Sequence, residues 1–469
     1  MVSEVIGSVN ALLWGEGQLL IYILLFAGVW FSTRLGLIQL RQFTHMFTLL
    51  KGSSQASDQE VSSFQALCTG LSARVGTGNL AGVAVAISLG GSGAIFWMWV
   101  IALLGMATGF AESVLGQVYK VRDSQGEFRG GPAYYIQLGL NKRWLAVVFA
   151  MCLFLGYGFS FSAMQTNTIT DALSFAFDVP PLYSGIVITV LAGSIIMGGF
   201  KAIARFAERV VPVMGIVFVS AAVLITLINY AEVPAMIKDI ILSAFGLQEA
   251  GAGAMGAAIK NGIQRGLYSN EAGAGSVPHA SGAASPVPNH PVTQGYIQML
   301  GVFFDTIVLC SCTAVIILLA DVDISGEMEG IRLTQSAMTA HLAQGGVYFV
   351  AAAITLFAFT SVVANFAYAE SNLHLFKLDN KLGRSIYTAM YLGMMLWGAT
   401  ATLKEVWSLA DMALGLMTLV NIFAIIQLTP TVVALSKDYH DQRKQAKEPE
   451  FDPALVKVQG RCEPGVWDK

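Results

Sequence analysis

Long apolar blocks separated by short polar connections run through almost the whole sequence. The blocks at 94–118 and 347–368, for example, contain one charged residue between them. A helix that crosses the hydrocarbon core of a bilayer needs about 20 predominantly apolar residues. The pattern therefore predicts an all-α polytopic membrane protein. We expect eleven membrane-spanning segments, at 17–33, 62–89, 94–118, 144–170, 182–200, 209–230, 253–284, 293–320, 347–373, 386–402 and 406–435.

The composition supports a single membrane-embedded unit. Of the 469 residues, 55% are apolar and 12% are charged, whereas soluble proteins average about 25% charged residues. We expect one transmembrane domain, 1–435, followed by a polar cytoplasmic tail, 436–469. No basic residue precedes the first segment, so we interpret that segment as a membrane span rather than a secretory signal.

Basic residues are distributed unequally between the predicted loops. Alternate loops and the tail contain 21 Lys and Arg residues, whereas the opposite loops contain Lys238, Arg332 and Lys404. Cytoplasmic loops of membrane proteins are enriched in Lys and Arg. We therefore expect the N-terminus outside the cell and the C-terminus in the cytoplasm.

Two of the predicted segments are interrupted by glycines. The second contains GLSARVGTGNLAG at 70–82, and the seventh contains RGLYSNEAGAGSVP at 265–278, five segments later. Interrupted helices at matching positions of two halves are typical of transporters built from inverted repeats, which bind substrate at the breaks. We expect a first repeat at 62–230, a second at 253–435 and an extra helix at 17–33. The alternative is that the glycines only permit close helix packing.

An interrupted helix exposes backbone groups that can bind an amino acid. The helix that starts near Gly78 presents N–H groups and a positive dipole end, which suit a carboxylate. The helix that ends near Val75 presents carbonyl oxygens, which suit a sodium ion or an ammonium group. Within a membrane, such exposed groups need a partner. Polar side chains that add to this site are Thr77, Asn79, Ser269 and Asn270, with Glu271 beside them.

Six sequence blocks resemble those of one family of membrane transporters. The blocks VGTGNLAGVAVAI, GSGAIFWMWV, GMATGFAES, RGGPAYYI, GLYSNEAGAGSVP and FFDTIVLC occur in this order across essentially the whole chain. They resemble the alanine or glycine:cation symporters. The resemblance implies a leucine-transporter-type fold, a five-plus-five inverted repeat with one extra N-terminal helix, in a bacterial or archaeal inner membrane. It also implies symport of a small neutral amino acid, such as alanine or glycine, with sodium or sometimes a proton.

The resemblance extends the candidate substrate site to Gln165, for which an interhelical hydrogen bond is the alternative. The predicted substrate-binding residues are Gly76, Thr77, Gly78, Asn79, Gln165, Ser269, Asn270, Gly273 and Asn365. Asn365 departs from the family pattern, because many members have Gly-Trp where this chain has Ala364-Asn365. The smaller amide predicts a pocket that tolerates serine or a larger polar side chain, unless Asn365 bonds a neighbouring helix outside the pocket.

Ligands for a coupling cation are expected near the first break. In leucine-transporter-type proteins, one sodium site joins carbonyls of the first break to hydroxyls of a later helix, here Thr360 and Ser361. The predicted cation ligands are Ser72, Val75, Phe357, Thr360, Ser361 and Asp305. Two alternatives stay open. Thr and Ser often bond their own helix, and Asp305 either binds the cation or a proton, or pairs with Arg74 or Arg265.

Other functional classes have little support in the sequence. It contains no Walker loop, HExxH motif or His/Cys cluster, which disfavours a pump or a membrane enzyme. An ion channel is the remaining alternative. We expect no enzymatic cofactor and no nucleic-acid partner; the partners are an amino acid, sodium and the lipid bilayer, with the protein as a monomer.

The remaining conspicuous residues receive structural interpretations. His279 and His290 are expected in solvent near a loop, and Cys310 and Cys312 in the apolar core. Two further acids near helix ends, Glu112 and Glu370, are expected in gating or structural pairs.

Overall fold

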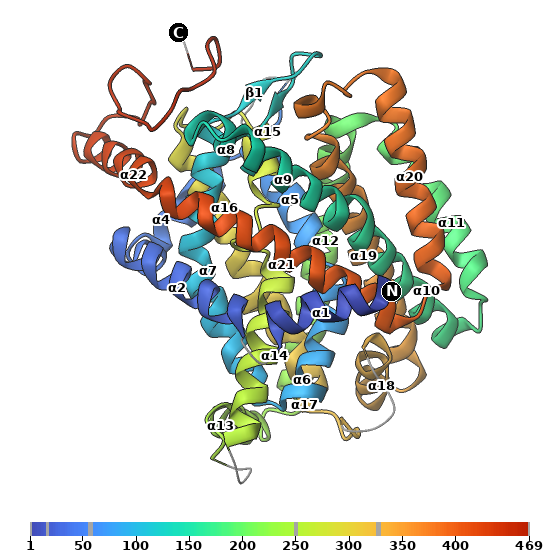
Figure 1. Ribbon diagram of the computed structural model, residues 1–469. Helices are drawn as coiled ribbons and strands as arrows, with labels where there is room; N and C mark the ends of the chain where they lie inside the picture. Colours follow the sequence, from blue (N-terminus) through green and yellow to red (C-terminus); the bar gives the residue numbers. More distant parts are fainter. Residues whose placement is uncertain (1, 16–17, 55–59, 248–251, 325–329, 468–469) are drawn as a thin grey trace.

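The computed structural model describes residues 2–15, 18–54, 60–247, 252–324 and 330–467 (Figure 1). Residue 17 of the first predicted segment and residues 468–469 of the predicted tail lie outside this description. Helices dominate the described residues. The strands found among them, β1 (Val121–Arg122) and β2 (Phe128–Arg129), form one short antiparallel hairpin. The all-α class predicted from the apolar pattern is confirmed.

Helices occupy all eleven predicted segments. They are α2 (Leu19–Arg34), α5 (Ser63–Arg74) with α6 (Val83–Gly90), α7 (Gly93–Val118), α9 (Arg143–Leu153) with α10 (Phe161–Phe177), α11 (Pro181–Ile196), α12 (Gly199–Ile228), α14 (Ala252–Asn270) with α15 (Pro278–Ala283), α16 (Pro291–Val302) with α17 (Ser311–Leu318), α19 (Gln344–Glu370), α20 (Lys381–Thr400) and α21 (Leu403–Gln427). Helices outside or at the edges of these segments are α1 (Val2–Trp14), α3 (Ile38–Arg41), α4 (Phe43–Gly52), α8 (Pro132–Gly139), α13 (Val233–Ala244), α18 (Ile331–Leu342), η4 (His374–Phe376) and α22 (Thr429–Lys444).

Six helices in the described part of the chain are long and apolar enough to cross a membrane. They are α7, α9–α10, α12, α16–α17, α19 with η4, and α21. The segments α5–α6 and α14–α15 are interrupted, and α2 and α11, with 16 residues each, are shorter than these six helices. The eleven crossings and the inverted repeat therefore stay predictions.

Two helices are interrupted inside the protein. After α5 ends at Arg74, the chain resumes as a π-helical turn, η1 (Gly78–Gly82). The second interruption lies between α14 and α15, where Gly273 and Gly275 have φ angles of 93° and 84°. Glycine adopts this left-handed region without the steric cost that a side chain brings, which explains both glycines. Regular α-helix is absent between Arg74 and Gly78 at the first break, and between Asn270 and Pro278 at the second.

Two further π-helical stretches lie in helices that reach the breaks. The stretch η2 (Phe154–Ser160) joins α9 to α10, and η3 (Phe303–Cys310) joins α16 to α17. A π-helix pairs residues i and i+5 and occurs frequently at functional sites. These stretches therefore change which side chains share a helix face.

The C-terminal part of the chain folds back onto the helices. The predicted segment 406–435 consists of two helices, because α21 ends at Gln427 and α22 begins at Thr429. In the predicted tail, the indole N–H of Trp467 donates to the carbonyl of Val118 at 3.2 Å. Figure 1 shows this tail, in red, beside α22 and near the β1 hairpin.

Candidate functional site

The first break contacts Gln165 of α10. The backbone N–H and the hydroxyl of Thr77 both donate to Oε1 of Gln165, at 2.9 and 2.8 Å. The N–H of Gly76 donates to Oδ1 of Asn79 at 3.0 Å. A Cβ atom on Gly76 would collide with Ser361 Oγ and would lie 2.8 Å from the Gln165 amide. Gly76 therefore marks the point where the broken helix, α10 and α19 meet.

A polar cluster surrounds Asp305 of η3. Asn79 Nδ2 donates to Oδ1 of Asp305 at 2.8 Å, and the hydroxyls of Ser269 and Thr306 donate to Oδ2 at 2.6 and 2.8 Å. The carboxylate is completely buried. The structure thus brings together three of the predicted residues from the two breaks and η3.

Cys310 belongs to the same polar cluster. Its Sγ atom lies 3.0 Å from Ser269 Oγ and 3.4 Å from Asn79 Nδ2. Cys310 is buried in the core, as expected, but its neighbours there include polar groups. The physical reason is η3: Asp305 and Cys310 are five residues apart, and a π-helix pairs such positions, whereas an α-helix separates them. No sequence signal revealed this π-helical stretch.

The hydroxyl pair of α19 lies beside the end of α5. Ser361 Oγ is within hydrogen-bonding distance of the carbonyls of Val75 (3.2 Å) and Phe357 (3.1 Å). Thr360 donates to the Phe357 carbonyl at 2.8 Å, and Ser72 Oγ donates to the Thr360 carbonyl at 2.7 Å. The predicted cation ligands other than Asp305 therefore form one oxygen-rich cluster, in which the hydroxyls also bond their own helix.

The backbone of the second break is hydrogen-bonded by two side chains, Glu112 and Asn421, that were not among the predicted site residues. Glu112 of α7 accepts the N–H of Gly273 at 3.2 Å, and Asn421 of α21 donates to the Gly273 carbonyl at 2.9 Å. Asn421 also donates to Glu112 at 2.9 Å and accepts from Tyr135. Glu112 therefore acts as an acceptor for an interrupted helix, which sequence spacing alone does not show.

Two buried amides near the breaks have unpaired atoms. Neither the oxygen nor the nitrogen of the Asn365 side chain has a hydrogen-bond partner, and Asn365 is completely buried. Asn270 accepts the N–H of Ala272 at 3.0 Å, but its Nδ2 has no partner. Buried amides normally have partners. Asn365 lies one turn from Ser361 on the same face of α19, so a ligand at the first break could supply one.

The buried bases Arg74 and Arg265 do not pair with Asp305. Arg265 forms an ion pair with Asp411 at 3.1 Å, rather than with Asp305. Arg74 donates to the carbonyl of Gln298 at 3.3 Å, while its Nε and Nη2 atoms have no partner. Within the described residues, no ion pair joins Asp305 to a base. The structure therefore shows no direct ion pair between Asp305 and either Arg74 or Arg265.

Both histidines that were expected in solvent are buried. His279 is 1% exposed and His290 is fully buried. The Nδ1 atom of His290 accepts the N–H of Val292 at the start of α16, 3.1 Å away. Its Nε2 atom lies 3.2 Å from Asp438 of α22. Burial lowers the pKa of His290 and outweighs the opposing effect of Asp438. For His290 the expectation fails because the polar C-terminal region covers this loop. His279 is instead buried against Tyr368 and Asn372.

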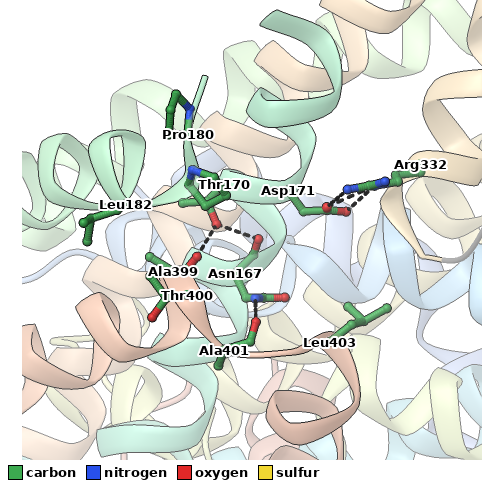
Figure 2. A pocket seen from close by; sticks show the side chains of 11 residues that line it. Asn167, Thr170, Asp171, Pro180, Leu182, Arg332, Ala399, Thr400, Ala401 and Leu403 are labelled. Atoms are coloured by element: carbon green, nitrogen blue, oxygen red, sulfur yellow. Dashed lines mark hydrogen bonds and ion pairs between the residues drawn. The ribbon is translucent and has the colours of Figure 1, made fainter. Parts of the chain in front are cut away.

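Every predicted substrate or cation residue is buried. A pocket of about 610 Å³ lies elsewhere, between the end of α10 and the connection from α20 to α21. Figure 2 shows the ion pair between Asp171 and Arg332, with a shortest distance of 2.6 Å, beside this pocket. At another helix end, Glu370 forms an ion pair with Arg384. Because all the predicted substrate and cation residues are buried, both breaks are closed off from solvent in this conformation.

Comparisons with known proteins identify the family. Residues 1–453 match the sodium:alanine symporter family. The chain belongs to this family. It is 44% identical to the uncharacterized transporter YaaJ of Escherichia coli, over 98% of both chains. It is 42% identical to the probable sodium/glutamine symporter GlnT of Bacillus subtilis, over 97% of this chain and 95% of that relative. The sodium/alanine symporter AgcS of Methanococcus maripaludis is 35% identical, over 94% and 98%.

A comparison with a solved structure of another transporter shows the fold of this chain. The crystal structure of MhsT in complex with L-phenylalanine matches with a TM-score of 0.57 and 14% sequence identity. The match covers 81% of this chain and 99% of the MhsT chain. The predicted leucine-transporter-type fold is confirmed. With the family, it establishes a multi-pass membrane transporter that is not an enzyme.

The side chains at the breaks suit a hard cation better than a transition metal. Within the described residues, no group of three or more His, Cys, Asp or Glu side chains could hold a metal ion. The clusters at Asp305 and Ser361 instead consist mainly of hydroxyl, carbonyl and carboxylate oxygens. Such oxygens are the ligands of hard cations. This agrees with sodium as the ion named in the family description.

Proposed function

We propose that this transporter carries small neutral amino acids, such as alanine and glycine, into the cell together with sodium. The main support is the meeting of three elements at Gly76: the broken helix, Gln165 and Ser361. An amino acid bound on one side of this point and a cation on the other would each affect the position of Gly76. Binding of the two would therefore be coupled.

In this proposal, the first break binds the backbone of the amino acid. The N-terminal end of η1, at Thr77 and Gly78, offers a positive dipole end to the substrate carboxylate. Gln165 orders this turn through its two bonds with Thr77. The unpaired amide of Asn365 would bond the substrate, directly or through water. Gly78 also permits close packing, because its Cβ position lies 3.2 Å from Ser269 Cα.

Two oxygen clusters are candidates for the coupling cation. The first contains oxygens of Val75, Phe357, Thr360 and Ser361, with Ser72 linking the two helices. Thr and Ser hydroxyls can turn their lone pairs toward a cation when one is bound. The carbonyl of Val75 lies directly before Gly76, which connects this cluster with the substrate site.

The second cluster is centred on Asp305. A buried carboxylate without a basic partner is costly. Asn79, Ser269 and Thr306 reduce this cost by donating hydrogen bonds, but they supply no compensating positive charge. A sodium ion or a proton at Asp305 would supply it. We assign a proton as the alternative coupling ion to this residue.

Glutamine is the second candidate substrate. The GlnT relative is named as a probable sodium/glutamine symporter and is 42% identical to this chain. Asn365 favours this candidate, because its unpaired amide could bond the amide of a glutamine side chain. Competition of glutamine and serine with alanine for uptake would rank the three substrates.

The proposed setting is a bacterial inner membrane, with the transporter as a monomer. The excess of Lys and Arg in alternate loops supports an outside N-terminus and a cytoplasmic C-terminus. The pocket beside Asp171 and Arg332 would then face the outside. The positions of the two breaks, five predicted segments apart, support the five-plus-five repeat in the transmembrane domain 1–435 and the separate tail 436–469.

Uptake by the purified protein in liposomes tests the proposed function. We expect saturable accumulation of radiolabelled alanine when a sodium gradient points inward, and little accumulation without it. One charge moving through 100 mV gives about 2.3 kcal/mol, and a tenfold sodium gradient adds about 1.4 kcal/mol. Together they permit roughly 500-fold accumulation. Uptake that ignores every imposed cation gradient would contradict symport, and unsaturable flux would indicate a channel.

A further inference from the structure

An apolar groove of about 400 Å³ lies between α5, α12, η3 and α4. Its walls include Leu71 of α5 with Val75 just after it, Pro212 and Gly215 of α12, and Leu50 of α4. A cavity with such walls in a membrane protein suits a hydrocarbon chain rather than a polar solute. None of the proposed transport steps uses this groove.

The groove is continuous with the surface of α12 that faces the lipid. In the 18-residue apolar stretch of α12, 28% is buried inside the protein. The corresponding share is 56–67% in the other five long apolar helices. Ile216, which lines the groove, is 67% exposed, and its neighbour Val217 is 52% exposed. Because the protein spans a membrane, the groove opens toward acyl chains rather than toward water.

The length of the groove matches one leaflet of a bilayer. Its wall along α5 runs from Phe64 to Val75, the residue after the helix ends, which is about 16 Å at the helical rise. Half of the hydrocarbon core of a bilayer is about 15 Å. The groove therefore extends from the end of the membrane where α5 begins to the depth of the first break.

Basic side chains lie at the shallow end of the groove. Arg205 and Arg209 are exposed and precede Pro212 on α12 at helical spacing, which places them above the groove. Arg209 also lines a separate apolar pocket against α19, and the acid between them, Glu208, accepts a hydrogen bond from Gln65. Lys51 is exposed next to Leu50, at the end of α4. Within the described residues, none of these three basic groups forms an ion pair. They could therefore attract a lipid phosphate.

We propose that the groove binds an anionic phospholipid, with one acyl chain between α5 and α12 and its phosphate near Arg205 and Arg209. The inner end of the chain lies against Val75, whose carbonyl belongs to the oxygen cluster at the first break. The lipid thereby supports the first half of the broken helix. This lipid site does not depend on the identity of the transported amino acid.

Photolabelling of the full-length protein in nanodiscs tests the site. The probes are phosphatidylglycerol and phosphatidylcholine that each carry a diazirine in one acyl chain, and labelled peptides are identified by mass spectrometry. We expect both lipids to label peptides 64–75 and 211–220. Phosphatidylglycerol should label them more strongly, by about fivefold for each basic residue that contacts its phosphate. Equal labelling by the two lipids would overturn the phosphate assignment.

Gly215→Phe is the variant that should fill the groove. A Cβ atom at Gly215 meets no other atom within 4 Å, so a side chain can start there without a clash, and Gly215 lines the groove that its ring would fill. Labelling of both peptides should fall at least fivefold. Gly393→Phe is the matched control, because Gly393 of α20 is equally unobstructed but lies outside the groove; its labelling should equal that of the wild type. Ile216→Trp provides a second filling variant.

The charge variant separates the phosphate from the acyl chain. In Arg205→Gln/Arg209→Gln, the preference for phosphatidylglycerol should disappear, while phosphatidylcholine still labels the groove. Wild-type labelling of both filling variants would overturn the proposal. Labelling of the wild-type groove by neither lipid would mean that another occupant, such as a second copy of this chain, covers it, and would also overturn the proposal.

Discussion

The break at Val75–Thr77 and the break between Asn270 and Pro278 are stabilised by different kinds of partner. At the first break, Gln165 holds Thr77, while the neighbouring amide of Asn365 is left unpaired. At the second break, Glu112 and Asn421 bond both the N–H and the carbonyl of Gly273. The first break therefore lies beside an amide with no partner on either atom, whereas at the second break only Nδ2 of Asn270 is left unpaired.

This difference indicates a division of roles. Interrupted helices in a membrane need partners for their exposed backbone groups. A break that exchanges partners can bind and release a substrate, whereas a break with fixed partners serves as a support. Substitutions at the second break should therefore affect stability most, and those at the first break should affect ligand binding most.

The largest effect is expected for Glu112→Leu at the second break. The substitution leaves the N–H of Gly273 without its acceptor and removes one acceptor of the Asn421 amide. Unpaired buried groups cost about 1–3 kcal/mol each, so unfolding should become easier by about 3 kcal/mol. Glu112→Gln is the control, because it retains an oxygen acceptor and should cost less. Thermal unfolding of the purified protein measures both; an unchanged melting temperature for Glu112→Leu would contradict the supporting role.

Gln165→Leu should show the opposite pattern at the first break. It removes the acceptor that orders Thr77, so the affinity for alanine should fall about 30-fold, which equals about 2 kcal/mol. Its melting temperature should fall less than that of Glu112→Leu. Asn167→Leu is the control on the same helix, because Asn167 bonds the carbonyls of Gly398 and Ala401 instead. If it weakened alanine binding as much as Gln165→Leu, the assignment of Gln165 would be wrong.

The membrane helices and the positions of the two breaks could be predicted from the sequence. Apolar blocks indicate membrane helices because a bilayer core imposes their length, and glycine clusters at 70–82 and 265–278 indicated the two breaks. The structure brings Thr77 to Gln165 and Ser361 to Val75. These contacts agree with the family resemblance, which placed Gln165 and Ser361 near the site.

The remainder depends on contacts that the sequence does not encode locally. The partners Glu112 and Asn421 are 309 positions apart, and no short-range pattern joins them. Cys310 enters the polar cluster because η3 is π-helical, and no pattern in the sequence indicates that local geometry. Likewise, His290 is buried because α22 folds back to place Asp438 beside it. Tertiary packing decides each of these cases.

Removal of the Thr360 and Ser361 hydroxyls should moderately weaken sodium coupling. In Thr360→Ala/Ser361→Ala, the cluster at the end of α5 loses two oxygen ligands, while the carbonyls of Val75 and Phe357 remain. The sodium concentration for half-maximal uptake should rise about tenfold, or about 1.4 kcal/mol. Thr355→Ala is the matched control, because Thr355 also bonds its own helix but lies farther from the break. An unchanged sodium dependence of the double variant would remove this cluster from coupling.

The smallest effect is expected for Asn365→Trp, which tests whether the unpaired amide of α19 faces the substrate. An indole at this position would narrow the pocket and remove the amide that could bond a polar side chain. Selectivity for glycine over serine or glutamine should rise about fivefold, the lower end of the 1–3 kcal/mol by which small differences in pocket volume typically change discrimination. Asn365→Leu separates the causes: it removes the amide without the bulk of an indole. Competition assays would show loss of polar substrates in both variants, but exclusion of larger apolar substrates in Asn365→Trp alone. If wild type and Asn365→Trp, both folded and active, rank their substrates identically, Asn365 lies outside the substrate pocket, and its unpaired amide no longer supports a ligand site at the first break.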